Sequence, residues 1–263
     1  MTSADSTNSS PGTPARRGFG IDVGGSGIKG GIVDLETGAL IGDRYKLLTP
    51  KPATPSAVAK TIAAVVNEFG WTGPIGVTYP GVVTHGIVRT AAHVDKSWIG
   101  TNASEVISAE LNGQQVVVLN DADAAGLAEE HYGAGKDTSG VVVVLTFGTG
   151  IGSAVIHNGI LLPNTEFGHL EVGGKEAERR AASSIRDKHG WSYKKWSKQV
   201  TRVLVAIENA MSPELFIAGG GISRKADKWV PLLKNRTPVV AAALQNTAGI
   251  VGAAMAATKD VTH

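Results

Sequence analysis

Short apolar runs separated by glycine-rich turns dominate the pattern of this chain. The two most regular turns are Asp22-Val-Gly-Gly-Ser-Gly-Ile-Lys29 and Thr146-Phe-Gly-Thr-Gly-Ile-Gly-Ser153, and each lies between two β-branched runs. This arrangement predicts two β-hairpins, whereas a dinucleotide-binding fingerprint or a Walker loop has to lead into a helix. Glycines leave their N–H groups unshielded and permit positive φ, so both turns are suited to cradle phosphate oxygens.

The rest of the chain alternates between strand-like and helix-like segments. We expect strands at 40–48, 74–79, 115–119 and 215–218, and helices at 54–69, 103–111, 120–130, 175–188, 194–211 and 247–257. Because the order of hairpin, strand and helices recurs in the second half, the pattern predicts a duplicated lobe. One group of apolar residues at helical spacing could form either core or an interface: Trp196, Val200, Val203, Leu204 and Ile207.

The composition is that of a globular α/β protein. A chain of 263 residues exceeds one ordinary core, so we expect two lobes, formed by residues 18–121 plus 247–263 and by residues 122–246. The polar segment 1–17 lacks the apolar stretch of a signal peptide and predicts a disordered tail on a cytoplasmic protein. The absence of cysteine excludes thiol catalysis and thiolate zinc sites, and no apolar run reaches the ~18 residues of a membrane span.

Charge is distributed unevenly. The net charge is only +2, yet residues 175–202 hold nine Lys or Arg against three acidic residues. A basic run of this kind is either a solvated helix face or a surface for an anionic partner.

Five segments, in the usual order, resemble the signatures of the actin, Hsp70 and sugar-kinase superfamily. The two glycine turns resemble its phosphate motifs, and Ile217-Ala-Gly-Gly-Gly-Ile-Ser223 resembles its adenosine motif. Leu119-Asn-Asp-Ala-Asp-Ala-Ala125 and Ala248-Gly-Ile-Val-Gly-Ala-Ala-Met255 resemble its two interdomain connectors. Within the superfamily, Glu166-Phe-Gly-His169 resembles the sugar-binding signature of ROK kinases. The whole chain is similar to actinobacterial polyphosphate glucokinases of that family.

The resemblance implies an α/β, two-lobed, actin-like (ribonuclease H-like) fold with a cleft between the lobes. It also implies transfer of a phosphoryl group from inorganic polyphosphate, and from ATP, to the 6-hydroxyl of glucose. Most ROK kinases carry a cysteine-rich zinc loop after the motif histidine, and here that stretch is Leu170-Glu-Val-Gly-Gly-Lys-Glu-Ala-Glu178. We therefore expect no zinc, and a loop held by salt bridges or a helix has to position the sugar ligands instead.

Asp121 is the candidate catalytic base. It follows an apolar strand directly and begins a helix, so it could be a simple helix cap or a carboxylate delivered into the cleft. With the other motifs present, we expect Asp121 to act as the base that takes the proton of the sugar hydroxyl. A positioned base of this kind typically raises the reaction rate ~10²–10⁴-fold. The resemblance implies the sugar-binding set Asn120, Asp121, Glu166, His169 and Glu178.

The donor side is assigned to the glycine turns. Asp22 is expected to hold Mg²⁺, through water, although it could instead begin the turn by bonding its own backbone. Lys29 could reach the phosphates or lie on the surface. The full donor-phosphate set is Asp22, Gly24, Gly25, Ser26, Gly27, Lys29, Thr146, Gly148, Thr149 and Gly150, with an adenosine-like turn at Gly219, Gly220 and Gly221.

Polyphosphate is a linear polyanion, so its binding would need many Lys or Arg contacts and would depend strongly on salt. The candidate track follows the sugar motif and comprises Lys175, Arg179, Arg180, Lys194, Lys195 and Lys198, with Arg224, Lys225 and Lys228 as an extension. Asn102 and the turn Tyr79-Pro80-Gly81 are further candidates for the sugar pocket.

Other functions remain as alternatives. An ATP-only ROK hexokinase acting on glucose, mannose or fructose is the nearest of them. A ROK-type sugar-sensing regulator would need a helix-turn-helix before the first strand, and only 17 polar residues precede it. We expect no nucleic-acid or membrane partner, and the resemblance implies a homodimer.

Overall fold

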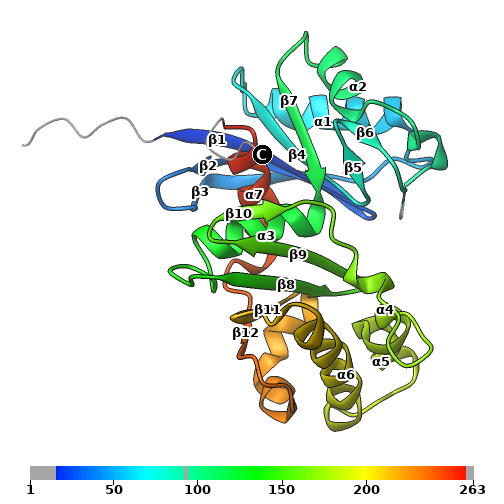
Figure 1. The fold of residues 1–263 in the computed structure, drawn as a ribbon. Helices are drawn as coiled ribbons and strands as arrows, with labels where there is room; N and C mark the ends of the chain where they lie inside the picture. The colour runs from blue at the N-terminus through cyan, green and yellow to red at the C-terminus, as the bar shows by residue number, and fades with distance from the viewer. Residues whose placement is uncertain (1–15, 92–93, 259–263) are drawn as a thin grey trace, which may run out of the picture.

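The computed structural model describes residues 16–91 and 94–258, and its ribbon shows two lobes stacked along one axis (Figure 1). Each lobe is built on a five-stranded sheet. The residues expected to form the tail lie outside the described part of the chain up to residue 15, and Arg17, its last member, already begins the first strand.

The first sheet has the strand order β3-β2-β1-β4-β7. Its first three strands are antiparallel neighbours, and β4 and β7 continue the sheet in parallel with β1. Helices α1 and α2 follow β3 and β6 along the chain, and the small β5–β6 hairpin lies beyond β4. The bounds are β1 Arg17–Gly24, β2 Gly27–Asp34, β3 Leu40–Leu47, α1 Pro55–Glu68, β4 Ile75–Tyr79, β5 Val83–Thr84, β6 Ile87–Val88, the 3-10 turn Lys96–Trp98, α2 Ala103–Ala109 and β7 Val116–Asn120.

The second sheet repeats the first, with the order β10-β9-β8-β11-β12. Again an antiparallel trio is extended by two parallel strands, so the predicted duplication and the two predicted hairpins are confirmed. The bounds are β8 Val141–Phe147, β9 Ile151–His157, β10 Ile160–Leu162, the 3-10 turn Phe167–His169, α4 Ala177–Ala181, α5 Ser183–Lys188, α6 Tyr193–Met211, β11 Leu215–Gly219, the 3-10 segments Gly221–Lys228 and Val230–Leu232, and β12 Val239–Ala241.

Two helices join the lobes. Helix α3 (Asp121–His131) follows β7 and packs on β8 and β9 of the second sheet, whereas α7 (Ala248–Ala256), entered through the 3-10 turn Gln245–Thr247, packs on β1 and β4 of the first. The two helices pack against each other between the sheets (Figure 1). A side chain at Gly76 or Gly252 would overlap backbone atoms of α7 or α3, so these glycines permit the close packing of the centre.

The lobes have separate cores. In the second lobe the apolar face of α6 lies against β8 and β11, with Trp196 and Trp229 fully buried around Phe147. All five apolar residues left open between core and interface are therefore core residues, at most 2% exposed. Among the described residues no helix is both long and apolar enough to cross a bilayer.

The predicted helix at 175–188 is wrong as a single element. The chain becomes extended at Ala182, with φ −55° and ψ 149°, and separates α4 from α5. Tertiary hydrogen bonds hold this break, because the Trp196 indole donates to Ala181 O at 2.9 Å and the Ser183 hydroxyl donates to Gly148 O at 3.0 Å.

Candidate active site between the lobes

A cavity of about 700 Å³ opens between the two sheets where β4, β7 and β8 end. It brings together most of the predicted sugar and donor residues, although they come from distant parts of the chain. Its lining includes Asn120, Asp121, Glu166, His169, Glu178, Thr146, Gly148, Thr149, Gly150 and Gly220. Pro80 and Gly81 also line it, as expected. Asn102 does not; it caps α2 instead, with its carbonyl oxygen accepting from Glu105 N.

Asp121 is the first residue of α3, and its neighbour Asn120 is the cap. The side-chain Oδ1 of Asn120 accepts from Ala122 N at 2.8 Å and Asp123 N at 3.1 Å, and its side-chain amide donates to Gly81 O at 3.2 Å. The cap role considered for Asp121 is therefore taken by Asn120. This leaves Asp121, an exposed residue, with its carboxylate at the cavity, where one oxygen accepts from Ala122 N at 2.9 Å.

The pKa of Asp121 is raised to about 6. Burial between the lobes is the largest cause, and the negative charges of Asp22 and Glu166 add to it, against the hydrogen bond from Ala122 N. A carboxylate with such a pKa remains ionised at neutral pH and is a stronger base than an exposed aspartate.

Asp22 lies beside the first glycine turn on the face of the sheet that α7 covers. Its carboxylate is 3.0 Å from the Lys29 ammonium and accepts from the Thr78 hydroxyl at 3.2 Å. Lys29 is thus neither fully exposed nor turned away, since its side chain is 26% exposed and directed across the hairpin. Asp22, Lys29 and the turn Gly24–Gly27 do not line the cavity itself, yet the charge of Asp22 acts on Asp121.

The second glycine turn forms the floor of the cavity. Gly148 N donates to Gly150 O at 2.9 Å, so Gly148 closes the turn while Thr149 and Gly150 follow it along the rim. The turn is supported from behind by α5: the Ser183 hydroxyl donates to Gly148 O, and the Ser184 hydroxyl donates to Thr149 O at 2.7 Å. These two serines were missed in the sequence because an ordinary Ser-Ser pair carries no sign of its tertiary partner.

The middle glycine of the adenosine-like turn, Gly220, also lines the cavity. Its φ is +81°, and a Cβ there would overlap the backbone of Phe147. Only glycine allows the end of β11 to approach β8 so closely.

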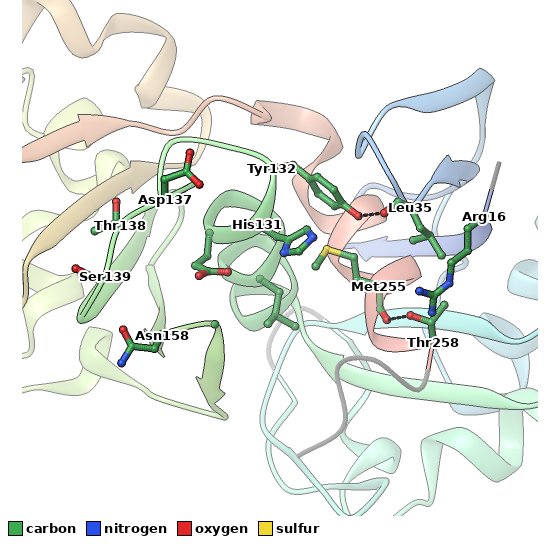
Figure 2. Close-up of a pocket in the computed structure, with 13 residues that line it drawn as sticks. Arg16, Leu35, His131, Tyr132, Asp137, Thr138, Ser139, Asn158, Met255 and Thr258 are labelled. Carbon is green, nitrogen blue, oxygen red and sulfur yellow. Dashed lines mark hydrogen bonds between the residues drawn. The ribbon is translucent and has the colours of Figure 1, made fainter. Parts of the chain in front are cut away.

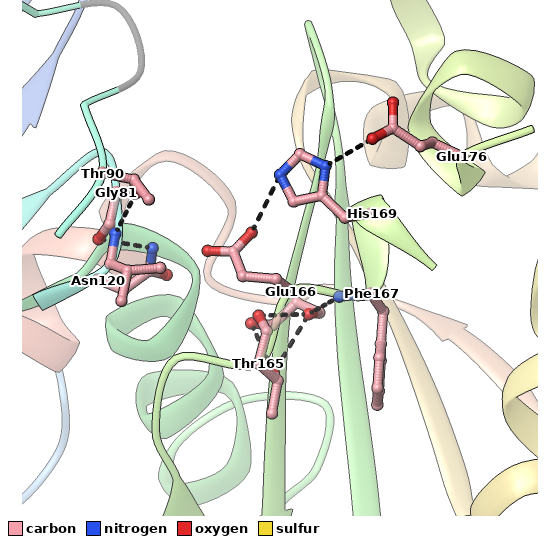
Figure 3. A network of polar contacts seen from close by, with 10 residues as sticks. Gly81, Thr90, Asn120, Thr165, Glu166, Phe167, His169 and Glu176 are labelled. Atoms are coloured by element: carbon pink, nitrogen blue, oxygen red, sulfur yellow. Dashed lines mark hydrogen bonds and ion pairs between the residues drawn. The ribbon is translucent and has the colours of Figure 1, made fainter. Parts of the chain in front are cut away.

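Glu166 and His169 lie at the two ends of a 3-10 turn and face one another. The His169 Nε2 lies 4.0 Å from the Glu166 carboxylate, and its Nδ1 lies 3.3 Å from Glu176 (Figure 3). Glu176 in turn pairs with Arg179 at 2.6 Å. Burial raises the pKa of Glu166, with Glu178 adding to the rise and His169 opposing it. The Glu178 carboxylate rests over Gly150, between the sugar side and the donor turn.

The loop before Glu166 is connected to both lobes. Asn164 forms two hydrogen bonds with the backbone of Val83 in the first lobe, at 3.0 and 2.8 Å, and its N–H donates to the Asp123 carboxylate at 2.8 Å. Neither Asn164 nor Asp123 was recognised in the sequence as part of the site. The positive φ of Asn164, 59°, is a sign visible only in the structure.

Two arginines of the candidate polyphosphate track have other partners. Arg180 donates to Val172 O, Gly173 O and Gln199, and Arg179 is paired with Glu176, so both hold the loop that carries the sugar ligands. Lys195 lies over the ring of Trp191, 5.1 Å from its centroid.

A second cavity, of about 620 Å³, lies at the other end of α3 (Figure 2). Tyr132, the C-cap residue of α3, and Met255 of α7 line it, and the Tyr132 hydroxyl donates to Leu35 O. None of the predicted site residues lies in its wall.

Two lobes of equal topology, with a carboxylate and a glycine turn lining the cavity between them, fit a phosphotransferase of the actin-like ATPase fold. Residues 18–190 match the ROK family, and the chain belongs to this family.

Relatives cover almost the entire chain. A polyphosphate glucokinase of Mycobacterium tuberculosis is 80% identical over 98% of this chain and 97% of its own length. A polyphosphate glucokinase of Mycobacterium leprae is 76% identical over 100% of this chain and 84% of its own length. The crystal structure of an inorganic polyphosphate/ATP-glucomannokinase from Arthrobacter sp. strain KM superposes with a TM-score of 0.86, at 51% identity, covering 92% of this chain and 98% of that one.

Proposed function

We propose that this chain transfers the terminal phosphoryl group of inorganic polyphosphate, and of ATP, to the 6-hydroxyl of glucose. The observation that carries the proposal is the position of Asp121. It lines the same cavity as Glu166, His169 and the turn Gly148–Gly150, and the charge of Glu166 acts on its carboxyl. The high identity to proteins named polyphosphate glucokinases supports the choice of donor and acceptor.

In the proposed reaction, Asp121 takes the proton of the glucose 6-hydroxyl as that oxygen attacks the terminal phosphorus. The bond from phosphorus to the bridging oxygen breaks, and its electron pair leaves with the shortened polyphosphate or with ADP. Because phosphoryl transfer needs positioning and charge stabilisation more than covalent help, the backbone N–H groups of Thr149 and Gly150 would face the transferred phosphoryl oxygens. The N–H of Gly148 is already bonded to Gly150 O.

Sugar recognition would use the polar side chains around Asp121. Asn120, Glu166, His169 and Glu178 offer amide, carboxylate and imidazole groups that can pair with the ring hydroxyls. Glu176 would hold His169 in its orientation without touching the sugar, since its carboxylate is bonded to Nδ1 of the ring.

Magnesium is the metal that this reaction class implies, and the oxygen atoms at Asp22 fit it. A half-buried carboxylate beside a glycine turn is a hard oxygen donor, and Mg²⁺ keeps several waters when it binds to one or two such groups. When bound, the metal would neutralise charge on the donor phosphates. Lys29, which pairs with Asp22, would contribute a further positive charge on the same side.

We further propose a cytoplasmic homodimer that takes no nucleic acid. Glucose and ATP are metabolites of the cytoplasm, and this supports the location. Ile160 and Leu162 on edge strand β10 are 71% and 57% exposed, and such apolar side chains support burial against a second copy. Sedimentation of the purified protein tests the dimer.

The first experiment is glucose 6-phosphate formation with Mg²⁺ and either ATP or nucleotide-free long-chain polyphosphate. We expect turnover with both donors, and a loss of at least ~10²-fold in kcat for Asp121→Asn with a folded protein. Asp43→Asn, an exposed aspartate on β3, is the matched control. Turnover with ATP alone would favour the ATP-only hexokinase, and near-normal turnover of Asp121→Asn would refute the assigned base.

A further inference from the structure

Two arginines from opposite lobes meet at Asn246, next to the start of α7. Arg44 of β3 donates to Asn246 O at 3.2 Å, and Arg224 of the segment after β11 donates to Asn246 Oδ1 at 3.4 Å. No described carboxylate forms a salt bridge with either guanidinium. Both residues are exposed, so two positive charges without a carboxylate partner lie beside the turn that leads into α7.

A row of charges leads from the catalytic centre to this pair. Asp22, Lys29 and Lys46 are direct cross-strand partners on β1, β2 and β3, so their side chains share one face of the sheet. Partners of this kind lie about 5 Å apart. Arg44 precedes Lys46 by two residues, where the pairing of β3 with β2 is irregular, and its Cβ lies 3.9 Å from the position of a Cβ at Gly31, which shares the face of Lys29. The bond from Arg44 to Asn246 shows that this face is directed toward α7 and the turn before it.

Lys46 also reaches the first glycine turn. A Cβ at Gly27 would overlap the Lys46 Cε, so this glycine leaves space for the lysine side chain to cross the hairpin. Lysines opposite one another on neighbouring strands repel each other. Asp22 neutralises Lys29 but not Lys46, which the described residues provide with no carboxylate partner. An anion bound along this row would relieve the repulsion.

We propose that Lys46, Arg44 and Arg224 form a polyanion subsite for the distal phosphates of a polyphosphate chain. The inference rests on the proposed function, because it places the part of the donor that does not react. The chain would enter the cavity with its terminal phosphate at Asp121 and leave along β1–β3 toward Asn246. This exit lies on the donor side of the site, away from Glu166 and His169.

The chemistry of the row fits a polyphosphate better than it fits a nucleic acid. A linear phosphate chain needs a succession of cations, whereas single-stranded nucleic acid binding adds aromatic platforms for its bases. The exposed side chains of the row are cationic, and the aromatic residue between Arg44 and Lys46, Tyr45, packs against the core on the other face. The basic segment after the sugar motif is a poorer candidate, because Arg179 and Arg180 are engaged in holding their own loop.

The test is a pair of N-lobe variants, Lys46→Ala and Arg44→Ala, and their combination. Lys60→Ala is the matched control, an exposed lysine on α1, which packs on the opposite face of the same sheet. KM for long-chain polyphosphate, tripolyphosphate and ATP is measured over a range of salt concentrations, and binding of long polyphosphate is measured separately without glucose. Arg224 is left intact because it lies beside the adenosine-like turn.

We expect the double variant to raise the KM and Kd for long polyphosphate about tenfold and to reduce the salt slope by roughly one to two. The values for tripolyphosphate and ATP should change less than twofold, and Arg44→Lys should restore most of the affinity. An unchanged Kd for long polyphosphate, or equal losses with all three donors, would overturn the subsite. Wild-type protein that binds long polyphosphate through these residues but makes no glucose 6-phosphate from it would overturn the proposed donor while supporting the subsite.

Discussion

Asp123 is a buried carboxylate that the proposed chemistry does not need in charged form. It lies on the first turn of α3 and is 1% exposed. One oxygen accepts from Asn164 N, and the other has no hydrogen-bond partner among the described residues. Burial raises its pKa from 3.8 to about 7, and the charges of Glu166 and Asp121 add to the rise, against the bond from Asn164. Replacing it with asparagine keeps the acceptor for Asn164 and removes the charge.

The raised pKa of Asp123 determines how the free energy of unfolding changes with pH. Because the folded-state pKa is raised, the folded protein binds more protons than the unfolded chain between pH 4 and pH 7, so stability falls as pH rises through this window. A rise of about three pKa units corresponds to about 4 kcal/mol lost by pH 8, of which roughly 2 kcal/mol is already lost at pH 5. An unpaired amide N–H in the variant would cost about 2 kcal/mol at either pH.

Urea unfolding of wild type and Asp123→Asn at pH 5 and pH 8 measures the difference. We expect nearly equal stability at pH 5 and a variant more stable by about 2 kcal/mol at pH 8, because the other titrating groups cancel in the comparison. Asp123→Ala, which also removes the acceptor of Asn164 N–H, should be less stable than Asp123→Asn at both pH values. A stability difference that does not grow with pH would refute the raised pKa.

Two further outcomes concern catalysis and sugar binding. The kcat/KM for glucose should rise with pH, level off above about 6 and be about tenfold lower at pH 5. The reason is that Asp121 must be ionised to accept a proton and its pKa is raised to about 6. A flat profile from pH 5 to pH 8 would exclude Asp121 as the titrating base. Glu176→Gln should raise the KM for glucose about fivefold and leave the KM for the donor unchanged, since the charge that orients His169 is lost. The control variant is Glu171→Gln in the same loop. Equal effects of both variants would argue against a positioning role for Glu176.

The local pattern of the chain was enough to predict most elements of the fold. The spacing of residues within a few positions of one another predicts the two hairpins, the repeated order of strands and helices, and the cap at the start of α3. The predicted helix at 175–188 is wrong because Ala182 and its neighbours favour a helix locally, while hydrogen bonds from Ser183 to Gly148 O and from Trp196 to Ala181 O require a break. Contacts between residues so far apart in the chain produce no periodic pattern in the sequence.

Some residues of the candidate site can likewise be predicted from the sequence, and others cannot. Asp121, Glu166 and His169 could be found because their types and spacing resemble a family motif, and the structure places them around one cavity. Glu176, Asn164 and Asp123 could not, because each acts through a partner that only the folded chain brings near. The charge of Arg180 predicts a contact with polyphosphate, whereas in the structure its guanidinium donates hydrogen bonds to Val172 O, Gly173 O and Gln199.

The duplicated lobes, the glycine turns and the residues able to carry out phosphoryl transfer can be predicted from the amino-acid order, since these features depend on neighbours within a few positions. Which charges are neutralised follows only from the folded chain. Lys29 is paired with Asp22 across a strand, Arg179 is paired with Glu176, and Arg44 meets Arg224 at Asn246 from the opposite lobe. Electrostatic energy depends on distance in space, and the chain sets that distance only when it is folded.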